Sequence, residues 1–494
     1  MKKLFIFLII AFSCTLNAFS ARGIGAFLSH STFYIHGQSP YVEMYLEIIG
    51  NTLKYKQTPT GLFQGSIQVT MIIKQDSVIK DFKKYELLSA EVEDTTGVGV
   101  NFIDQQRFIL PNGDYVMEFS IADNNVNKKP ETLLYPFTID FPSDKQSMSD
   151  IQLINSYTKT TKDNILSKSG YDLVPLVDNF FPSSKNKLTF YSEIYNPAYT
   201  EDSDEKFLIS YYIESFENHK ILNEYARSKR EISKPVTVVL NEFDITSLPS
   251  GNYNLVISLR DKANNILVTN SAFFQRSNPA MNSIAMDYSK VDLTNSFASR
   301  YTSADTLREY IRSLTPIATE MEKVFINHQS PTAELNTLQQ YFEKFWESRN
   351  AFEPETAWKK YNIQVQRVNK AYGTQVRKGY YTDMGNIYLK YGEPSTIQDM
   401  AYDAGNLSGE GAVPYQIWHY YSLNEGRERN KRFVFINSEV GAREYTLVHS
   451  DVKGEIQNWN WQKQLIRKLG VEDADESTMK RDQSRSGTIY NNPF

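Results

Sequence analysis

Cysteine is nearly absent from this sequence: its 494 residues include one, Cys14. A single thiol cannot form a disulfide within the chain, so disulfides do not contribute to its stability. Long apolar runs are missing too, since none reaches the roughly 18 residues of a membrane-spanning helix. The net charge is −5, so no basic excess attracts the chain to nucleic acid, and we expect no nucleic-acid partner.

The sequence motifs of common enzyme classes are also missing. The chain contains no Gly-x-Ser-x-Gly elbow, no His-Glu-x-x-His zinc motif and no glycine-rich phosphate loop ending in Lys-Ser or Lys-Thr. The acidic turns at residues 123–125 and 202–205 lack the glycine and distal glutamate of an EF-hand loop. We therefore expect no metal site, no cofactor and no catalytic residues.

The N-terminus has the pattern of a signal peptide. Lys2 and Lys3 precede an apolar run at residues 4–12, and the small residues Ala18 and Ser20 fit a cleavage site. This pattern predicts a signal peptide at residues 1–20. The protein is then exported, and we expect it in the periplasm or at the outer membrane.

A second interpretation of the same segment stays open. Residues 11–13 before Cys14 resemble a bacterial lipobox, in which Cys14 would carry lipid and tether the protein to a membrane. Phe12 departs from the small or β-branched residue that is usual at its position. Labelling cells with a fatty-acid analogue separates lipidation from plain secretion.

In two long regions apolar residues alternate with polar ones, as in half-buried strands. Aromatic residues, at 13 % of the chain, also favour strands. Residues 22–145 and 170–277 each predict a β-sandwich, because short strands are separated by turn residues. Each region contains a Leu-Pro-x-Gly-x-Tyr segment, starting at Leu110 and at Leu248. This repeat indicates an internal duplication. We expect two immunoglobulin-like sandwiches joined by a polar connector at residues 146–169.

The C-terminal part changes pattern twice. Residues 303–372 predict a helical segment, because apolar residues such as Trp358 and Val365 recur at steps of three and four. Alternation returns at residues 373–470, which predicts an α+β domain. Residues 471–494 are charged and polar and are expected to form a flexible tail. Its last residues would either add as a strand to the sheet of a partner or pack back on their own domain.

One stretch, at residues 379–394, joins the helices to the C-terminal strands. Asp383 and Gly385 predict a tight turn, with the carboxylate bonded to nearby backbone and a positive φ at the glycine. Alternation at residues 387–391 then predicts a strand, which ends at Pro394. Asp383 is therefore expected to anchor a turn rather than to act as a catalytic acid.

This stretch resembles the GWxTD domain, a family of uncharacterised envelope proteins found mainly in Bacteroidota. The resemblance extends over residues 340–450, and Tyr380 stands where the family signature has tryptophan. It implies an envelope protein and no established activity. The motif positions, which we expect to be structural, are Gly379, Tyr380, Thr382, Asp383, Gly385, Tyr391, Gly392 and Pro394.

A weaker, alternative site would combine Glu393, His419 and His449 with Asp383. Two histidines on neighbouring strands beside a carboxylate could exchange protons or bind a metal. Alternation places His449 on the strand face of Leu447, and the spacing of these residues matches no metal motif. Structural roles are therefore expected for these residues.

These patterns favour a non-enzymatic structural or interaction protein of the bacterial cell envelope. Its expected partners are other envelope proteins, such as those of the outer-membrane or secretion machinery, and its oligomeric state stays open. The alternative is a periplasmic enzyme or glycan-binding protein that uses the aromatic surface of the C-terminal domain and the glycine-rich loop at residues 400–414. A deep cleft joining Asp383, Glu393 and the two histidines would favour the alternative, and a filled core there would favour the first function.

Overall fold

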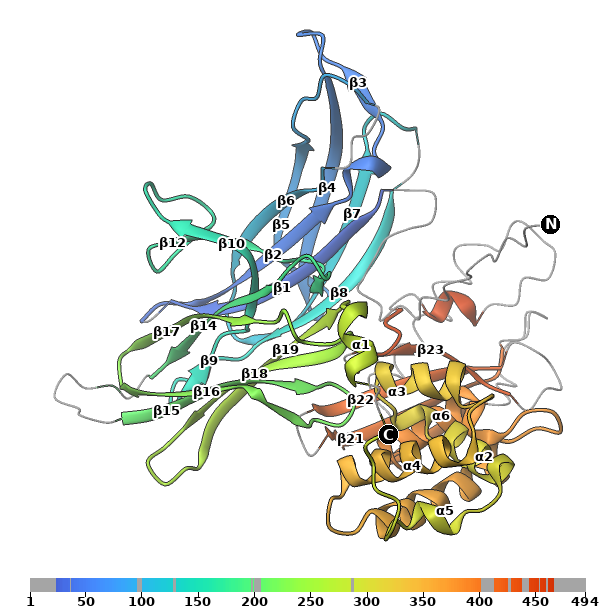
Figure 1. Cartoon of the computed structure of the whole chain (residues 1–494). Coiled ribbons are helices and arrows are strands. Elements are labelled where there is room, and N and C mark those ends of the chain that lie inside the picture. The colour runs from blue at the N-terminus through green and yellow to red at the C-terminus, as the bar shows by residue number, and fades with distance from the viewer. Residues whose placement is uncertain are drawn as a thin grey trace.

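The structure, a computed structural model, contains three parts in sequence order: two β-sandwiches and a helical C-terminal part that includes a third β-structure (Figure 1). The predicted signal segment with Cys14, the tail at 471–494 and most of the loop at 400–414 lie outside the described residues. No helix among the described residues is long and apolar enough to cross a membrane. The described residues are 24–35, 37–95, 100–127, 130–196, 199, 206–285, 288–400, 413–424, 428–437, 444–452, 454–458 and 461–465.

The first sandwich packs a three-stranded sheet against a larger one around an apolar core that includes Met44 and Phe119. The smaller sheet has the order β1-β2-β6, with bounds Ala26–Tyr34, Pro40–Ile48 and Phe102–Ile109. The larger has the order β3-β4-β7-β8, and β5 also pairs with β4. Its bounds are β3 Tyr55–Gln57, β4 Phe63–Gln75, β5 Val78–Leu88, β7 Gly113–Asp123 and β8 Glu131–Ile139, and the short 3-10 helix η1 is Gly50–Thr52.

The second sandwich repeats this arrangement. The order β10-β14-β17 corresponds to β1-β2-β6, and β16-β15-β18-β19 corresponds to β5-β4-β7-β8. Its additional short strands are β9, β11, β12 and β13, and its apolar core includes Phe190 and Leu255. The bounds are β9 Ser147–Met148, β10 Gln152–Lys159, β11 Ser167–Lys168, β12 Tyr171–Pro175, β13 Phe180–Phe181, β14 Lys187–Tyr195, β15 Lys206–Ser215, β16 Ile221–Ile232, β17 Val236–Asp244, β18 Gly251–Arg260 and β19 Ile266–Arg276.

The repeated Leu-Pro-x-Gly-x-Tyr segment has the same role in both sandwiches. The hydroxyl of Tyr115 donates to the carbonyl of Pro111 at 2.8 Å, and that of Tyr253 donates to the carbonyl of Pro249 at 3.1 Å. Each tyrosine therefore fastens the start of its own strand, β7 or β18. This shared bond is what the duplication predicts.

The expected connector at residues 146–169 is instead part of the second sandwich. It contains β9, β10 and β11, and β10 pairs with both β12 and β14. The polar composition of this segment predicted a connector because the second half of β10 is exposed and polar. Leu153 and Ile154 in its first half are buried. The two sandwiches therefore follow one another without a spacer of this length.

The helices form a layer beside the C-terminal sheet (Figure 1). Their core is strongly aromatic, with Tyr341, Phe342 and Trp358 each at most 1 % exposed. Ser303 caps α2 by accepting a hydrogen bond from the backbone N–H of Thr306. The bounds are α1 Pro279–Ala285, η2 Ala298–Arg300, α2 Ala304–Ser313, η3 Thr315–Ile317, α3 Glu320–Val324, the π-helix η4 Phe325–Gln329, α4 Leu335–Arg349 and α5 Pro354–Tyr372.

The C-terminal sheet has the antiparallel order β20-β21-β22-β23. Trp418 and Phe433 on one face share a core with Val368 of α5 and with α6, whereas Ile417 and Val434 share a core with Trp461. The bounds are η5 Gly379–Tyr381, α6 Asp383–Tyr391, β20 Thr396–Met400, β21 Tyr415–Leu423, β22 Glu428–Ile436, β23 Thr446–Ser450 and η7 Trp461–Gln464.

Candidate functional site

The motif stretch forms a 3-10 turn followed by a helix, so the strand predicted at residues 387–391 is wrong. Thr382 is the N-cap of α6, and its hydroxyl oxygen accepts from the N–H of Gly385 at 3.1 Å. The buried residues Met384, Ile387 and Tyr388 recur at helical spacing. Ile387, Tyr388 and Leu389 are all buried, so the alternation in the sequence does not mark an inner and an outer face.

The positive φ predicted at Gly385 is found at Gly392 instead. Gly385 does not have a positive φ, whereas Gly392 does, at +84°, and ends α6. A Cβ at Gly385 would overlap the carbonyl oxygen of Gly379, and a Cβ at Gly379 would overlap the carbonyl oxygen of Val368. These two glycines therefore allow α5, η5 and α6 to approach at backbone distance.

Asp383 fastens α6 to the sheet. Its Oδ2 accepts a hydrogen bond from the backbone N–H of Leu447 in β23 at 2.8 Å. Burial raises the pKa of Asp383, and the bond from Leu447 opposes that shift. The expected bond to its own turn is made by Thr382 instead, so the anchoring function of Asp383 reaches a distant strand.

The signature position and the end of α6 are also used for packing. Tyr380 is 1 % exposed, and its hydroxyl is 3.1 Å from Glu309 of α2. Tyr391 donates to Glu455 at 2.8 Å. Glu393, 73 % exposed, lies 3.4 Å from Arg367, and Pro394 follows it. These contacts connect η5 to α2, the end of α6 to the segment after β23, and the turn after α6 to α5.

The two histidines lie on the sheet face away from α6. In β21, His419 pairs with Arg432, whereas His449 of β23 pairs with Val434. Strand β22 separates the two histidines, so they are not on neighbouring strands. A register shift beside Val434 also turns His449 away from Leu447, which belongs to the core on the α6 side. The predicted common face of His449 and Leu447 is wrong for this reason.

Both histidines are buried, and burial lowers the pKa of each. His449 has a pKa of about 3, and its Nδ1 accepts from the N–H of Asn458 at 3.0 Å. His419 packs edge-on against Tyr421. The described residues contain no group of three potential ligands that could hold a metal ion. The structure thus places Asp383, Glu393 and the histidines at separate positions.

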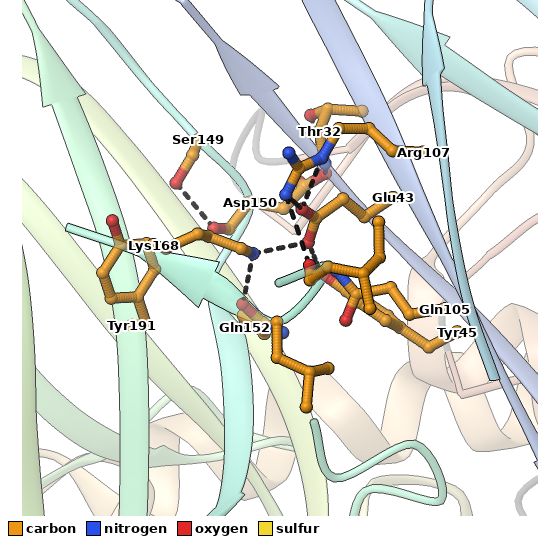
Figure 2. A network of polar contacts seen from close by, with 12 residues as sticks. Thr32, Glu43, Tyr45, Gln105, Arg107, Ser149, Asp150, Gln152, Lys168 and Tyr191 are labelled. Atoms are coloured by element: carbon orange, nitrogen blue, oxygen red, sulfur yellow. Dashed lines mark hydrogen bonds and ion pairs between the residues drawn. The ribbon is translucent and has the colours of Figure 1, made fainter. Parts of the chain in front are cut away.

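A buried network of charges between the two sandwiches has no counterpart in the sequence predictions (Figure 2). Glu43 of β2 is fully buried, and its carboxylate accepts from Lys168 of β11 at 2.5 Å and from Arg107 of β6 at 2.6 Å. Tyr45 donates to the same carboxylate at 2.6 Å, and Lys168 also donates to Gln152 at 2.7 Å. The network therefore joins strands of both sandwiches through one carboxylate.

Burial lowers the pKa of Lys168 to about 8, while the adjacent Glu43 opposes that shift. A buried ion pair of this kind is retained only with good geometry and further hydrogen bonds, which Arg107, Tyr45 and Gln152 supply here. The sequence carried no signal of this network, because Glu43 and Tyr45 alternate with apolar residues as the solvated face of a half-buried strand does.

Two further contacts close the junction. Asp150 accepts from both the N–H and the hydroxyl of Thr32, at 2.8 and 2.7 Å, and both residues are drawn in Figure 2. Phe33 forms a buried cluster with Leu173 and Tyr191 of the second sandwich. The ion network, the backbone bonds and the apolar cluster together hold the sandwiches in one relative orientation.

A groove of about 870 Å³ opens where all three parts of the protein meet. Its walls include His30 and Val116 of the first sandwich, Gln152 of the second, and Arg432 and Gln457 of the C-terminal part. A smaller hollow of about 320 Å³ lies between the second sandwich and the helices and is lined in part by Tyr253, Tyr288 and Glu217. Burial raises the pKa of Glu217.

A family model, described as the GWxTD domain, matches residues 282–465. The chain contains a GWxTD domain. The match includes helices α2 to α5 as well as the motif stretch and the sheet. It therefore begins well before the segment that carries the motif.

No curated protein matches the chain. Among solved structures, a red sea bream transglutaminase is 8 % identical with a TM-score of 0.17, and the match covers 51 % of this chain and 31 % of that one. Fibronectin(III)-like modules of Clostridium thermocellum CbhA are 10 % identical with a TM-score of 0.13, covering 48 % and 85 %. A DUF3823 family protein from Bacteroides ovatus is 11 % identical with a TM-score of 0.16, covering 44 % and 95 %. Likenesses this weak carry no inference about activity.

Proposed function

We propose that this GWxTD domain-containing protein is a non-enzymatic structural and interaction protein of the bacterial cell envelope, and an accessory of outer-membrane or secretion machinery. The observation that carries the proposal is the use of the motif side chains. Thr382 caps α6, Asp383 joins α6 to β23, and Tyr380 joins η5 to α2. A site built this way positions a fold rather than a substrate.

The two N-terminal sandwiches, which we propose are immunoglobulin-like or fibronectin-like modules, support the same function. Modules of this architecture often carry binding surfaces on a rigid frame. Here the frame is stiffened by the buried pair of Glu43 and Lys168. The two sandwich walls of the groove are then held in one relative orientation, and we propose that a partner protein of the envelope occupies the groove.

The test compares two valine variants in protein purified from detergent-solubilised envelopes. Val116, 38 % exposed, lines the groove, whereas Val238, 40 % exposed in β17, does not. Val116→Arg should remove a specific, stoichiometric partner that wild type retains, because the new charge must be desolvated in the contact. Val238→Arg should keep it. Recovery of the wild-type chain alone, or equal retention by both variants, would refute the proposal.

The alternative, a periplasmic enzyme or glycan-binding protein, has one supporting observation. The hollow of about 320 Å³ combines aromatic residues with Glu217, whose pKa is raised by burial. Pockets with an apolar lining and a perturbed acid are common ligand sites. The aromatic residues predicted to face a glycan are less favourable, because Trp418 and Tyr420 are at most 2 % exposed. Binding of envelope glycans that Glu217→Gln abolishes would favour this alternative.

A further inference from the structure

Helix α5 is the outermost helix of the GWxTD domain and lies at the end of the molecule opposite β3 (Figure 1). Its inner face is apolar and packs on both neighbouring cores through Trp358, Val365 and Val368. Its outer face carries Lys359, Ile363 and further residues at steps of three and four. No described element covers that outer face, which makes it a surface of the molecule.

The outer face is basic in an acidic protein. Residues 354–372, which form α5, contain four Lys or Arg and one Glu, a net charge of +3, against −5 for the whole chain. Lys359 and Arg367 are 66 % and 59 % exposed. Lys360 and Lys370 are both exposed. Among the described residues, neither side chain forms a hydrogen bond or an ion pair. Their charges are therefore available to an external anion.

Large apolar side chains stand among these charges. Phe352 precedes α5 and is 98 % exposed, Val376 follows it and is 97 % exposed, and Ile363 at its centre is 64 % exposed. Phe352 and Val376 are the most exposed large apolar side chains among the described residues. Nothing in the described part of the fold explains this exposure at both ends of one helix. A solvated charged face would need none of these three residues.

We infer that the outer face of α5 docks on an anionic lipid surface. Basic residues on one helix face beside the exposed Ile363, with exposed apolar side chains just before and just after the helix, match the boundary between lipid headgroups and acyl chains. Lys360, Arg367 and Lys370 lie against the headgroups, and Phe352 and Val376 enter the boundary. A soluble polyanion or an acidic protein would use the charges alone, and the apolar residues select the lipid. The inference does not rest on the groove, so either proposal can fail without the other.

The experiment measures co-sedimentation of the full chain with vesicles. Wild type should bind vesicles of phosphatidylcholine with phosphatidylglycerol and should not bind vesicles of phosphatidylcholine alone. The double variant Lys360→Gln/Lys370→Gln should bind about 30-fold more weakly, because each basic residue near an anionic surface is worth on the order of five-fold. Binding should also weaken as salt rises from low to high concentration.

The matched control removes two exposed lysines elsewhere. Lys80 and Lys84 of β5 flank Phe82, which is 65 % exposed. Lys80→Gln/Lys84→Gln therefore removes the same two charges beside an exposed apolar side chain, but on a different surface. This control should bind like wild type, and thermal unfolding should show that all variants remain folded. Equal loss in control and test variants, or no binding by wild type, would overturn the inference.

A second pair of variants separates lipid from a general polyanion. Phe352→Ser/Val376→Ser leaves every charge in place and should weaken vesicle binding at least ten-fold while leaving binding to soluble heparin unchanged. Phe82→Ser serves as its control. If the Ser variants bind vesicles like wild type, the face recognises charge alone and the lipid surface is the wrong ligand.

Discussion

At the scale of single residues, Asp383 shows how a side chain predicted for one role serves a related one. Its carboxylate was expected to close its own turn, but it bonds to Leu447 in β23. The local bond belongs to Thr382, which caps α6. The side chains of Thr382 and Asp383 could both accept from N–H groups in the first turn of α6. The N-cap position of Thr382 gives its hydroxyl the bond to Gly385.

Replacing Asp383 with Ala should lower the free energy of unfolding by about 1–3 kcal/mol, because the N–H of Leu447 loses its partner in a half-buried position. Asp383→Asn, which keeps an oxygen acceptor, should cost less. Denaturant unfolding of the three proteins measures the order. Loss of function at an unchanged melting temperature in Asp383→Ala would contradict the structural role.

His449 predicts a pH dependence. Burial lowers its pKa from the ordinary 6.5 to about 3, so the unfolded chain binds the proton first as the pH falls. Its contribution to stability is therefore complete above pH 6.5 and is lost progressively toward pH 3. At two pH units below the unfolded value, the loss is about 3 kcal/mol.

The measurement compares denaturant unfolding near neutral pH and in mild acid for wild type and His449→Gln. Wild type should lose more stability on acidification than the variant, because glutamine does not titrate. His328→Gln, a change at an exposed histidine, is the control and should behave like wild type. Identical acid losses in wild type and His449→Gln would show that the buried imidazole is not responsible.

At the scale of elements, α6 is where prediction and structure differ most. The alternation of Ile387, Leu389 and Tyr391 fits a strand, and those residues also fit a helix that is buried on most of its circumference. Short apolar runs are ambiguous for this reason. The sandwiches were easier to predict, because the Leu-Pro-x-Gly-x-Tyr segments marked corresponding strands in both.

Gly385→Ala should destabilise the GWxTD domain far more than Thr382→Ala does. A Cβ at Gly385 meets backbone, the carbonyl of Gly379, which cannot move aside as a side chain could. Thr382→Ala removes one cap and should cost about 1 kcal/mol. Gly385→Ala should exceed about 3 kcal/mol, since α6 must shift from η5. Similar midpoints for both variants in urea would contradict the close approach.

At the scale of the whole molecule, the junction of the two sandwiches determines the shape of the groove. Glu43 is fully buried and bonded from both sides of the junction, by Arg107 and by Lys168. Removal of one partner from a buried pair leaves the other charge uncompensated. Stability and relative orientation are therefore linked at this carboxylate.

Glu43→Gln should lower stability by about 3–5 kcal/mol and should separate the unfolding of the two sandwiches in calorimetry. Its control is Glu118→Gln, which breaks the partly exposed pair of Lys74 and Glu118 within the first sandwich and should cost under about 1 kcal/mol. A single, unshifted transition in Glu43→Gln would show that the network does not couple the sandwiches.

The sequence by itself determined the repeated β-modules and the helical region, because strand alternation, helical spacing and turn motifs are local patterns. It also carried the motif residues by which the chain resembles the GWxTD domain. The tertiary structure alone decided what the motif residues contact, since Asp383 and Leu447 meet only after α6 packs on β23. It likewise decided that His419 and His449 lie apart from Asp383, and that Glu43 meets Lys168. Contacts of this kind depend on the relative placement of distant elements, and no local pattern records it.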